Sequence, residues 1–233
     1  MCGRFVLKAP VAEIKDWFGT ASAPPEAGPR YNVAPTQNVL TVRFNPENRE
    51  RSLDALRWGL VPIWAKDPSI GNKLINARAE TLADKPSFRD AFAKRRCLIP
   101  ASAFYEWKKP DAPKGTKQPY AIGMANGGLF AFAGLWERWK TPEGDILRSC
   151  TIITTEANDT LRPIHNRMPV ILGPDAYGTW LGEEEVSPEA LVALMRPFDP
   201  GRMRSWPVGP RVGAVANQGE DLMAETQPTV NSA

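Results

Sequence analysis

The sequence contains few of the residues that build metal centres or disulfide frameworks. Its 233 residues include three cysteines, Cys2, Cys97 and Cys150, and a single histidine, His165. An odd number of cysteines without a C-x-x-C pair argues against both a disulfide framework and a zinc site. We therefore expect a protein without a metal or other cofactor, working in a reducing compartment. Cys97 and Cys150 lie in apolar segments, where we expect them to be buried and unreactive.

Long apolar runs are also lacking. No stretch approaches the roughly 20 residues that cross a bilayer, and the opening MCGRFVLKAP contains no signal-peptide core. The sequence therefore predicts a cytoplasmic protein with no membrane partner. The formal net charge of +3 permits nucleic-acid binding without requiring it.

Short strand-like segments separated by turns dominate the chain, and helical segments occur between them at irregular intervals. No regular βαβ alternation, internal repeat or linker is visible, which predicts one α+β domain with mainly antiparallel strands. We expect this domain to cover residues 1–218 and a flexible tail to cover residues 219–233. The expected helices are 10–18, 86–96, 156–162, 174–181 and 187–195; the expected strands are 39–44, 53–58, 97–99, 120–124, 129–135 and 146–155, with a hairpin turn at 126–128.

Cys2 is the residue with the most distinctive chemistry. Removal of Met1 would turn it into a terminal 1,2-aminothiol, whose amine titrates near pH ~7.7–8.0 and is partly neutral at neutral pH. Such a group suits an aldehyde, because the amine forms a Schiff base and the thiol then closes a thiazolidine ring. We expect Cys2 to lie outside the core, so that Cys2→Ala leaves folding intact. The alternative is that a cysteine after the initiator methionine is incidental.

Several blocks of sequence together resemble the SRAP family (SOS-response-associated peptidases). They occur in the order of the family and extend over about 170 residues, so that jointly they are specific although each alone is weak. The resemblance implies a curved or barrel-like sheet core flanked by short helices. The blocks are 1–5 (MCGRF), 30–36 (RYNVAPT), 57–62 (RWGLVP), 75–81 (INARAET), 96–100 (RCLIP), 104–108 (FYEWK) and 164–169 (IHNRMP).

The resemblance also implies an activity. Family members sense abasic sites in single-stranded DNA and bind the opened deoxyribose covalently through the cysteine that follows Met1. On this basis Cys2, Asn76, Glu106 and His165 match the active-site positions, single-stranded DNA with abasic sites is the expected partner, and the protein associates with the nucleoid when it is bound to DNA. We expect it to act as a monomer.

Each matching residue has a chemical role that fits its side chain. Glu106 lies among aromatic residues, which disfavour a charged carboxylate and suit it to moving protons; the alternative is a strand residue facing water. His165 would act as a general acid or base, or else serve a structural purpose. Asn76 would hold the amine or a sugar hydroxyl through hydrogen bonds, or else cap a turn.

Arginines accompany three of these residues. Arg4, Arg78 and Arg167 lie beside Cys2, Asn76 and His165, and planar guanidinium groups suit phosphate oxygens. Solvated surface roles are the alternative for each arginine. The family resemblance further suggests that Pro35 and Trp64 shape the DNA path, although Trp64 would equally suit a core.

Two other activities fit the same residues. Cys2 would serve as the nucleophile of an N-terminal cysteine peptidase, with its own amine as the base and removal of Met1 as an autoproteolytic step. Alternatively, the protein binds DNA without covalent chemistry and Cys2 is structural. A covalent band between the protein and an abasic oligonucleotide on a denaturing gel distinguishes the first interpretation from the other two.

Overall fold

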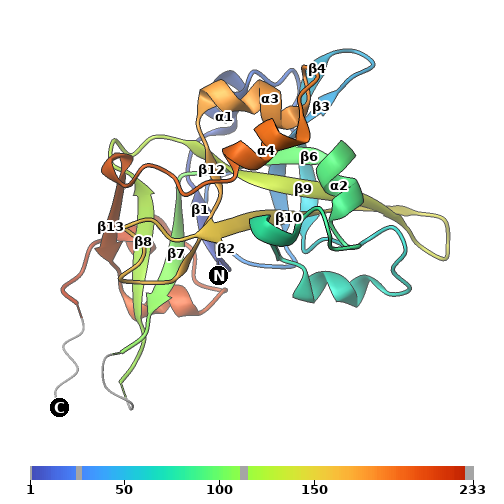
Figure 1. Ribbon diagram of the computed structural model, residues 1–233. Helices are drawn as coiled ribbons and strands as arrows, with labels where there is room; N and C mark the ends of the chain where they lie inside the picture. The colour runs from blue at the N-terminus through green and yellow to red at the C-terminus, as the bar shows by residue number, and fades with distance from the viewer. Residues whose placement is uncertain (1, 25–27, 111–114, 229–233) are drawn as a thin grey trace.

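A computed structural model describes residues 2–24, 28–110 and 115–228. Two β-sheets form the framework, and short helices lie at the periphery (Figure 1). Most strand pairs are antiparallel, and among the strands of the described residues β10 alone pairs in parallel, with β4 and β5. The predicted α+β class with mainly antiparallel strands is therefore confirmed.

Five strands of the larger sheet close into a barrel. They pair in the order β10, β4, β3, β6 and β9, and β9 pairs again with β10. The barrel-like core implied by the family resemblance is thus present. β5, β11 and β12 extend this sheet beyond the barrel. The strands of the larger sheet are β3 (Asn38–Asn45), β4 (Glu50–Trp58), β5 (Asn76–Arg78), β6 (Arg96–Ala101), β9 (Phe130–Lys140), β10 (Ile146–Glu156), β11 (Arg167–Pro169) and β12 (Ile171–Leu172).

The smaller sheet packs against the barrel through aromatic side chains. The ring of Phe5 lies 5.4 Å from Trp58 and 5.7 Å from Phe132, and the ring of Phe104 lies 5.9 Å from Phe132, each with edge-on geometry. Edge-on aromatic pairs add to the gain from burying their area. This contact fixes the start of the chain between the two sheets. The smaller sheet has the order β13 (Met203–Pro207), β8 (Gln118–Met124), β7 (Ala103–Lys108), β1 (Phe5–Leu7) and β2 (Arg30–Val33).

The helices are short and confirm most of the predicted ones. The first begins after Pro10, buries Ile14 and Phe18, and ends at Gly19 in the left-handed conformation (φ 62°). Ser187 caps another by accepting a hydrogen bond from the Ala190 N–H at 3.2 Å. Helices α1, α3 and α4 lie over one end of the barrel in Figure 1. The α-helices are α1 (Val11–Phe18), α2 (Arg89–Lys94), α3 (Tyr177–Leu181) and α4 (Pro188–Leu194); the 3₁₀ helices are η1 (Pro68–Lys73), η2 (Ala79–Thr81), η3 (Pro174–Ala176), η4 (Pro200–Arg202), η5 (Pro210–Gly213) and η6 (Glu220–Met223).

Two local predictions are wrong. The turn at 126–128 forms, with the Gly127 N–H bonded to the Met124 carbonyl at 2.9 Å, but the flanking β8 and β9 belong to different sheets and do not pair as a hairpin. Instead of the predicted helix over 156–162, Glu156 ends β10 and residues 159–162 form turns. The side chain of Asn158 accepts a hydrogen bond from the Leu161 N–H and donates one to the Phe198 carbonyl, which favours a turn, and Pro163 blocks helix continuation.

Part of the predicted C-terminal tail packs against the domain. Leu222 is buried, and the Trp206 indole N–H donates a hydrogen bond to the Met223 carbonyl at 2.8 Å. The expectation of flexibility from Gly219 onward is therefore wrong for 220–226, because an apolar residue and backbone hydrogen bonds hold that segment. Residues 229–233 lie outside the described part of the chain.

The segment before the tail reaches back to the start of the chain through Asn32. This side chain is fully buried and donates hydrogen bonds to the carbonyls of Val212, Ala214 and Asn217 at 3.0–3.2 Å. Its oxygen accepts a hydrogen bond from Arg4 at 2.7 Å. Asn32 therefore joins the first residues of the chain to the segment 212–217.

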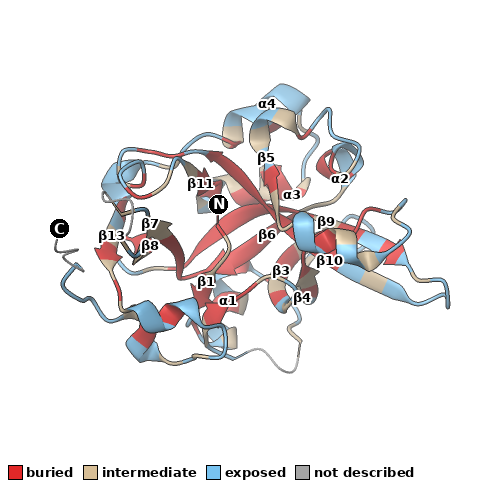
Figure 2. Ribbon diagram, turned by 90° about the horizontal axis from the view of Figure 1, so that it is seen from below, coloured by how far each residue is buried: buried red, intermediate tan, exposed pale blue. Residues whose placement is uncertain are grey.

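Burial follows the two sheets. Strands β6 and β9 are largely buried, whereas helices α1, α2 and α4 keep one face exposed (Figure 2). Within the described residues, no helix has both the length and the apolar character needed to cross a bilayer. The buried core extends from the barrel interior to the residues around Cys2.

Candidate active site

Cys2 lies in the core at the junction of the two sheets. Its side chain is fully buried, so the expectation that it lies outside the core is wrong. The antiparallel pairing of β1 with β7 explains this position, because Phe5 pairs with Phe104 and the Tyr105 N–H donates to the Arg4 carbonyl at 2.9 Å. Continuing this register toward the start of the chain places Gly3 opposite Glu106, so Cys2 lies one residue beyond that level. Met1 lies outside the described residues.

Asn76 holds the backbone of Cys2 from the barrel side. Its amide nitrogen donates a hydrogen bond to the Cys2 carbonyl at 2.9 Å. Asn76 begins β5, which pairs in parallel with β10 through Asn76 and Ile152. The Asn76 side-chain oxygen is buried and has no hydrogen-bond partner among the described residues. This unused acceptor lies in the same amide group that binds Cys2.

Glu106 supplies a buried carboxylate to the same place. Its side chain is 4% exposed, which rules out the alternative of a strand residue facing water. It lies on β7 opposite Tyr120, and its charge acts on the Cys2 thiol. Cys2, Asn76 and Glu106 are therefore brought together from three different strands or segments.

The electrostatic environment keeps the Cys2 thiol protonated. Burial raises its pKa far above the ordinary value, and the charge of Glu106 raises this pKa further. The positive charge of the amino terminus and a hydrogen bond from the Arg4 backbone lower the pKa by smaller amounts. A thiol in this setting is not a resting thiolate, so it needs a neighbouring group to accept its proton when it reacts.

His165 lies in the turn just before β11. Its backbone N–H bonds to the Leu161 carbonyl, and its Nδ1 accepts a hydrogen bond from the Arg167 N–H at 3.0 Å. The same Nδ1 lies 3.2 Å from the Arg167 carbonyl oxygen, so whether it donates or accepts depends on the tautomer of the ring. β11 pairs with β10, and β10 pairs with β5, which begins at Asn76. His165 and Asn76 are therefore connected through paired strands of one sheet.

The three predicted arginines differ in what they contact. Arg4 donates to the Asn32 side chain and to the Val212 carbonyl at 2.8 Å, and it lies over the Trp107 ring at 5.7 Å. These contacts engage its guanidinium within the protein. Arg78 is exposed and its side chain has no hydrogen bond or ion pair within the part of the chain that the structure describes.

Arg167 forms an ion pair that the sequence did not predict. Its two terminal nitrogens bind both carboxylate oxygens of Glu80 at 2.6 and 3.0 Å, and one also donates to the Thr154 carbonyl at 2.7 Å. Glu80 lies two residues after Arg78, and this proximity was the only sequence signal for it.

Trp64 and Pro35 lie on exposed segments. The Trp64 side chain is 54% exposed, so the alternative of a core residue is wrong. Its indole N–H donates to the Pro86 carbonyl at 3.4 Å. The neighbouring Ile63 is 61% exposed, a feature that sequence reasoning missed. Pro35 is half-buried and precedes Thr36, which adopts a positive φ of 71°.

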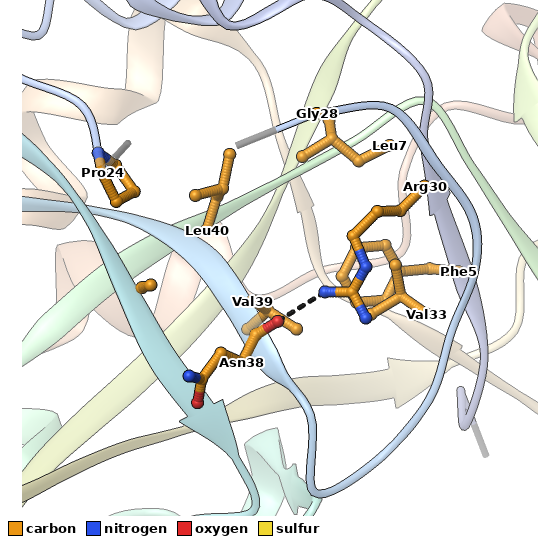
Figure 3. A pocket seen from close by; sticks show the side chains of 10 residues that line it. Phe5, Leu7, Pro24, Gly28, Arg30, Val33, Asn38, Val39 and Leu40 are labelled. Carbon is orange, nitrogen blue, oxygen red and sulfur yellow. Dashed lines mark hydrogen bonds between the residues drawn. The ribbon is translucent and has the colours of Figure 1, made fainter. Parts of the chain in front are cut away.

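A separate cavity of about 350 Å³ lies between β1, β2 and β3 (Figure 3). Its walls are mainly apolar and include Phe5, Leu7, Val33 and Val39. The guanidinium of Arg30 points toward Asn38 and donates to its carbonyl at 2.6 Å. None of the nine predicted site residues lines this cavity.

Comparison with known proteins identifies relatives over nearly the whole chain. The protein is 47% identical over 225 residues to the abasic site processing protein YoqW of Bacillus subtilis, covering 96% of this chain and 99% of the relative. It is 35% identical over 207 residues to the abasic site processing protein HMCES of Pongo abelii, covering 73% of this chain and 58% of the relative.

Solved structures share the fold. A crystal structure of a protein from Bacteroides thetaiotaomicron is similar with a TM-score of 0.86 at 23% identity, covering 97% of this chain and all of that one. A protein from Bordetella bronchiseptica is similar with a TM-score of 0.74 at 28% identity, covering 89% of this chain and all of that one. The family model for SOS response associated peptidase (SRAP) matches residues 1–215, and the chain therefore belongs to the SRAP family.

Proposed function

We propose that this protein processes abasic sites in single-stranded DNA by binding the opened deoxyribose covalently through Cys2 after Met1 is removed. Relatives that carry the name abasic site processing protein support the general role. The observation that carries the chemical proposal is the grouping of Cys2 with Asn76 and Glu106 in a buried setting. The pair of amine and thiol on Cys2 is suited to an aldehyde, which is what an abasic sugar exposes on ring opening.

The amine reacts first in this proposal. The neutral amine of Cys2 adds to the aldehyde carbon, and loss of one water from the carbinolamine gives an imine. The buried oxygen of Asn76 accepts a hydrogen bond from this amine in the proposal; the bond from the nitrogen of the same amide to the Cys2 carbonyl supports this role. Holding the amine in one orientation removes part of the entropic barrier to its attack.

The thiol then closes the ring. Its sulfur adds to the imine carbon, the thiol proton leaves to the Glu106 carboxylate, and a proton returns from Glu106 to the nitrogen. The product is a thiazolidine, and one water is released overall. This order agrees with a protonated thiol, whose raised pKa makes a resting thiolate unfavourable. In the reverse direction Glu106 returns the proton to sulfur, so the same carboxylate serves reversal.

His165 and the surface residues complete the proposal. The imidazole of His165 is suited to protonating the sugar ring oxygen as the aldehyde opens, or the hydroxyl that leaves as water. The exposed side chain of Arg78 is suited to a phosphate, and exposed Trp64 is suited to stacking on a base, with Pro35 beside the path. Arg4 acts mainly within the protein in this structure, because its guanidinium already has three partners.

A denaturing gel tests this function. Purified protein whose Met1 has been removed, as verified by mass spectrometry, is mixed with a single-stranded oligonucleotide that carries one abasic site. We expect a heat-stable shifted band for the wild type and for Cys97→Ala, which removes another fully buried thiol, and no such band for Cys2→Ser. A band that persists in Cys2→Ser, or in protein that retains Met1, contradicts the proposal. Peptide cleavage without a band would favour the peptidase alternative.

A further inference from the structure

Glu80 places a carboxylate against Arg167, one of the arginines that the sequence predicts to contact DNA. Its oxygens lie 2.6 and 3.0 Å from the two terminal nitrogens of Arg167. The positive charge of Arg78 also acts on Glu80. The Glu80 side chain is 48% exposed, whereas that of Arg167 is 17% exposed, so solvent reaches the acid more freely than the base.

The geometry of this pair is the geometry in which arginine binds phosphate. Two parallel N–H groups of one guanidinium meet two oxygens of one anion, an arrangement that arginine forms with carboxylates and phosphates alike. The Thr154 carbonyl accepts a further hydrogen bond from Arg167. Nε of Arg167 is buried and has no hydrogen-bond partner within the described residues. On its exposed side the guanidinium of Arg167 therefore binds mainly the Glu80 carboxylate.

Glu80 is charged when the protein is at neutral pH. Hydrogen bonding from Arg167 holds the pKa of its carboxyl below the ordinary value, and the charges of Arg167 and Arg78 lower this pKa further. A phosphate that approaches Arg167 must therefore displace a negative charge. An exposed carboxylate on a three-residue 3₁₀ helix can rotate away, because η2 fixes its backbone and leaves its side chain in solvent.

We propose that Glu80 is a specificity-determining residue that competes with the phosphate backbone for Arg167 and so weakens binding to undamaged single-stranded DNA. The inference rests on the proposed function, and it takes Arg167 as a phosphate contact, as the sequence predicts. Weak non-covalent binding lets the protein dissociate from intact strands. At an abasic site the covalent bond through Cys2 holds the complex, so the loss of one phosphate contact has little effect there.

Salt dependence of binding provides the test. Affinity for a lesion-free single-stranded oligonucleotide is measured by fluorescence anisotropy over a series of salt concentrations, with Cys2→Ser in every protein to exclude covalent chemistry. We expect Glu80→Gln to bind about threefold to fivefold more tightly, the size of a partly exposed ion pair. The slope of log K against log salt steepens by about 0.7, because one more phosphate is neutralised.

Glu183→Gln is the matched control. Glu183 binds Arg51 through both of its oxygens, as Glu80 binds Arg167, and the substitution changes the net charge by the same amount. Arg51 joins the barrel to α1 and α3 and is not a proposed DNA contact. We expect this variant to keep the wild-type slope. An equal change in both variants would show a general charge effect and overturn the proposal.

An opposite result has a definite meaning. If Glu80 holds Arg167 in position for DNA, Glu80→Gln binds more weakly or with an unchanged slope, and the proposal is wrong. In an Arg167→Ala background Glu80→Gln should no longer steepen the slope; a steeper slope there also contradicts the proposal. Failure of the proposed function is separate, because it shows as loss of the covalent band with abasic DNA, whatever the salt dependence with intact DNA.

Discussion

Replacing Glu106 by glutamine changes the crosslinking rate through two effects of opposite sign. Glutamine cannot accept the proton of the Cys2 thiol, which slows ring closure. Removal of the Glu106 charge also lowers the pKa of this thiol, which increases the thiolate fraction and favours ring closure. The structure ranks the two effects, because burial contributes more than Glu106 to the raised pKa and remains in the variant.

Loss of the proton acceptor is therefore expected to dominate. General acid–base groups contribute about 10²–10⁴-fold to rates, so we expect covalent capture by Glu106→Gln to slow at least about 100-fold. Because burial still holds the thiol pKa above its ordinary value, the gain in thiolate near neutral pH is small. Non-covalent DNA affinity should be nearly unchanged, since the side chain is 4% exposed.

A quenched time course on denaturing gels between pH 7 and pH 9 measures the rate, and anisotropy with lesion-free DNA measures the affinity. Glu137→Gln is the control, because Glu137 is equally buried (3% exposed) and binds Arg95 outside the site. Thermal melting establishes that each variant is folded. A folded Glu106→Gln protein that captures DNA as fast as the wild type, or faster, would refute the proton-acceptor role.

Two further predictions concern stability. Phe5→Ala should lower the free energy of unfolding by about 3–5 kcal/mol, because the buried ring of Phe5 joins the two sheets. Each kcal/mol corresponds to a fall of about 2–4 °C in Tm. In a denaturant titration, a loss no larger than that caused by Ile63→Ala, at an exposed position, would contradict this packing. The protein should also lose stability above about pH 9, the ordinary pKa of a thiol, because burial raises the pKa values of Cys2, Cys97 and Cys150 in the folded state. The unfolded chain then releases protons that the folded chain retains, so stability is complete below the unfolded pKa and falls as pH rises toward the folded values. A Tm that is constant from pH 8 to pH 10.5 would contradict this reasoning.

The sequence predicts the local elements where periodicity and end signals agree. Residues 11–18 combine a first-turn proline, one apolar face and a terminal glycine, and the helix forms there. The turn at 126–128 was also predictable, but its strands separate into two sheets because partner choice depends on the whole fold. Residues 156–162 lack a helix because side-chain hydrogen bonds of Asn158 reach residues distant in sequence.

The residues that form the site could be predicted from the sequence, but most of their spatial arrangement could not. The resemblance placed Cys2, Asn76 and Glu106 in one set, and the structure joins them by contacts or charge. Full burial of Cys2 was not predictable, because it depends on β1 pairing with β7 and packing on the barrel. The Glu80–Arg167 pair joins residues 87 positions apart, and no spacing rule connects them.

The contacts of Asn32 make the setting of the first residues depend on residues that are synthesised much later. The carbonyls that it binds belong to Val212, Ala214 and Asn217, which leave the ribosome long after Cys2. Domains fold as units as they emerge during translation. A nascent chain that still lacks these late residues has an incomplete support for Arg4 and the strand it leads into. The side chain of Cys2 consequently gains its final setting only after residues 212–217 have been synthesised.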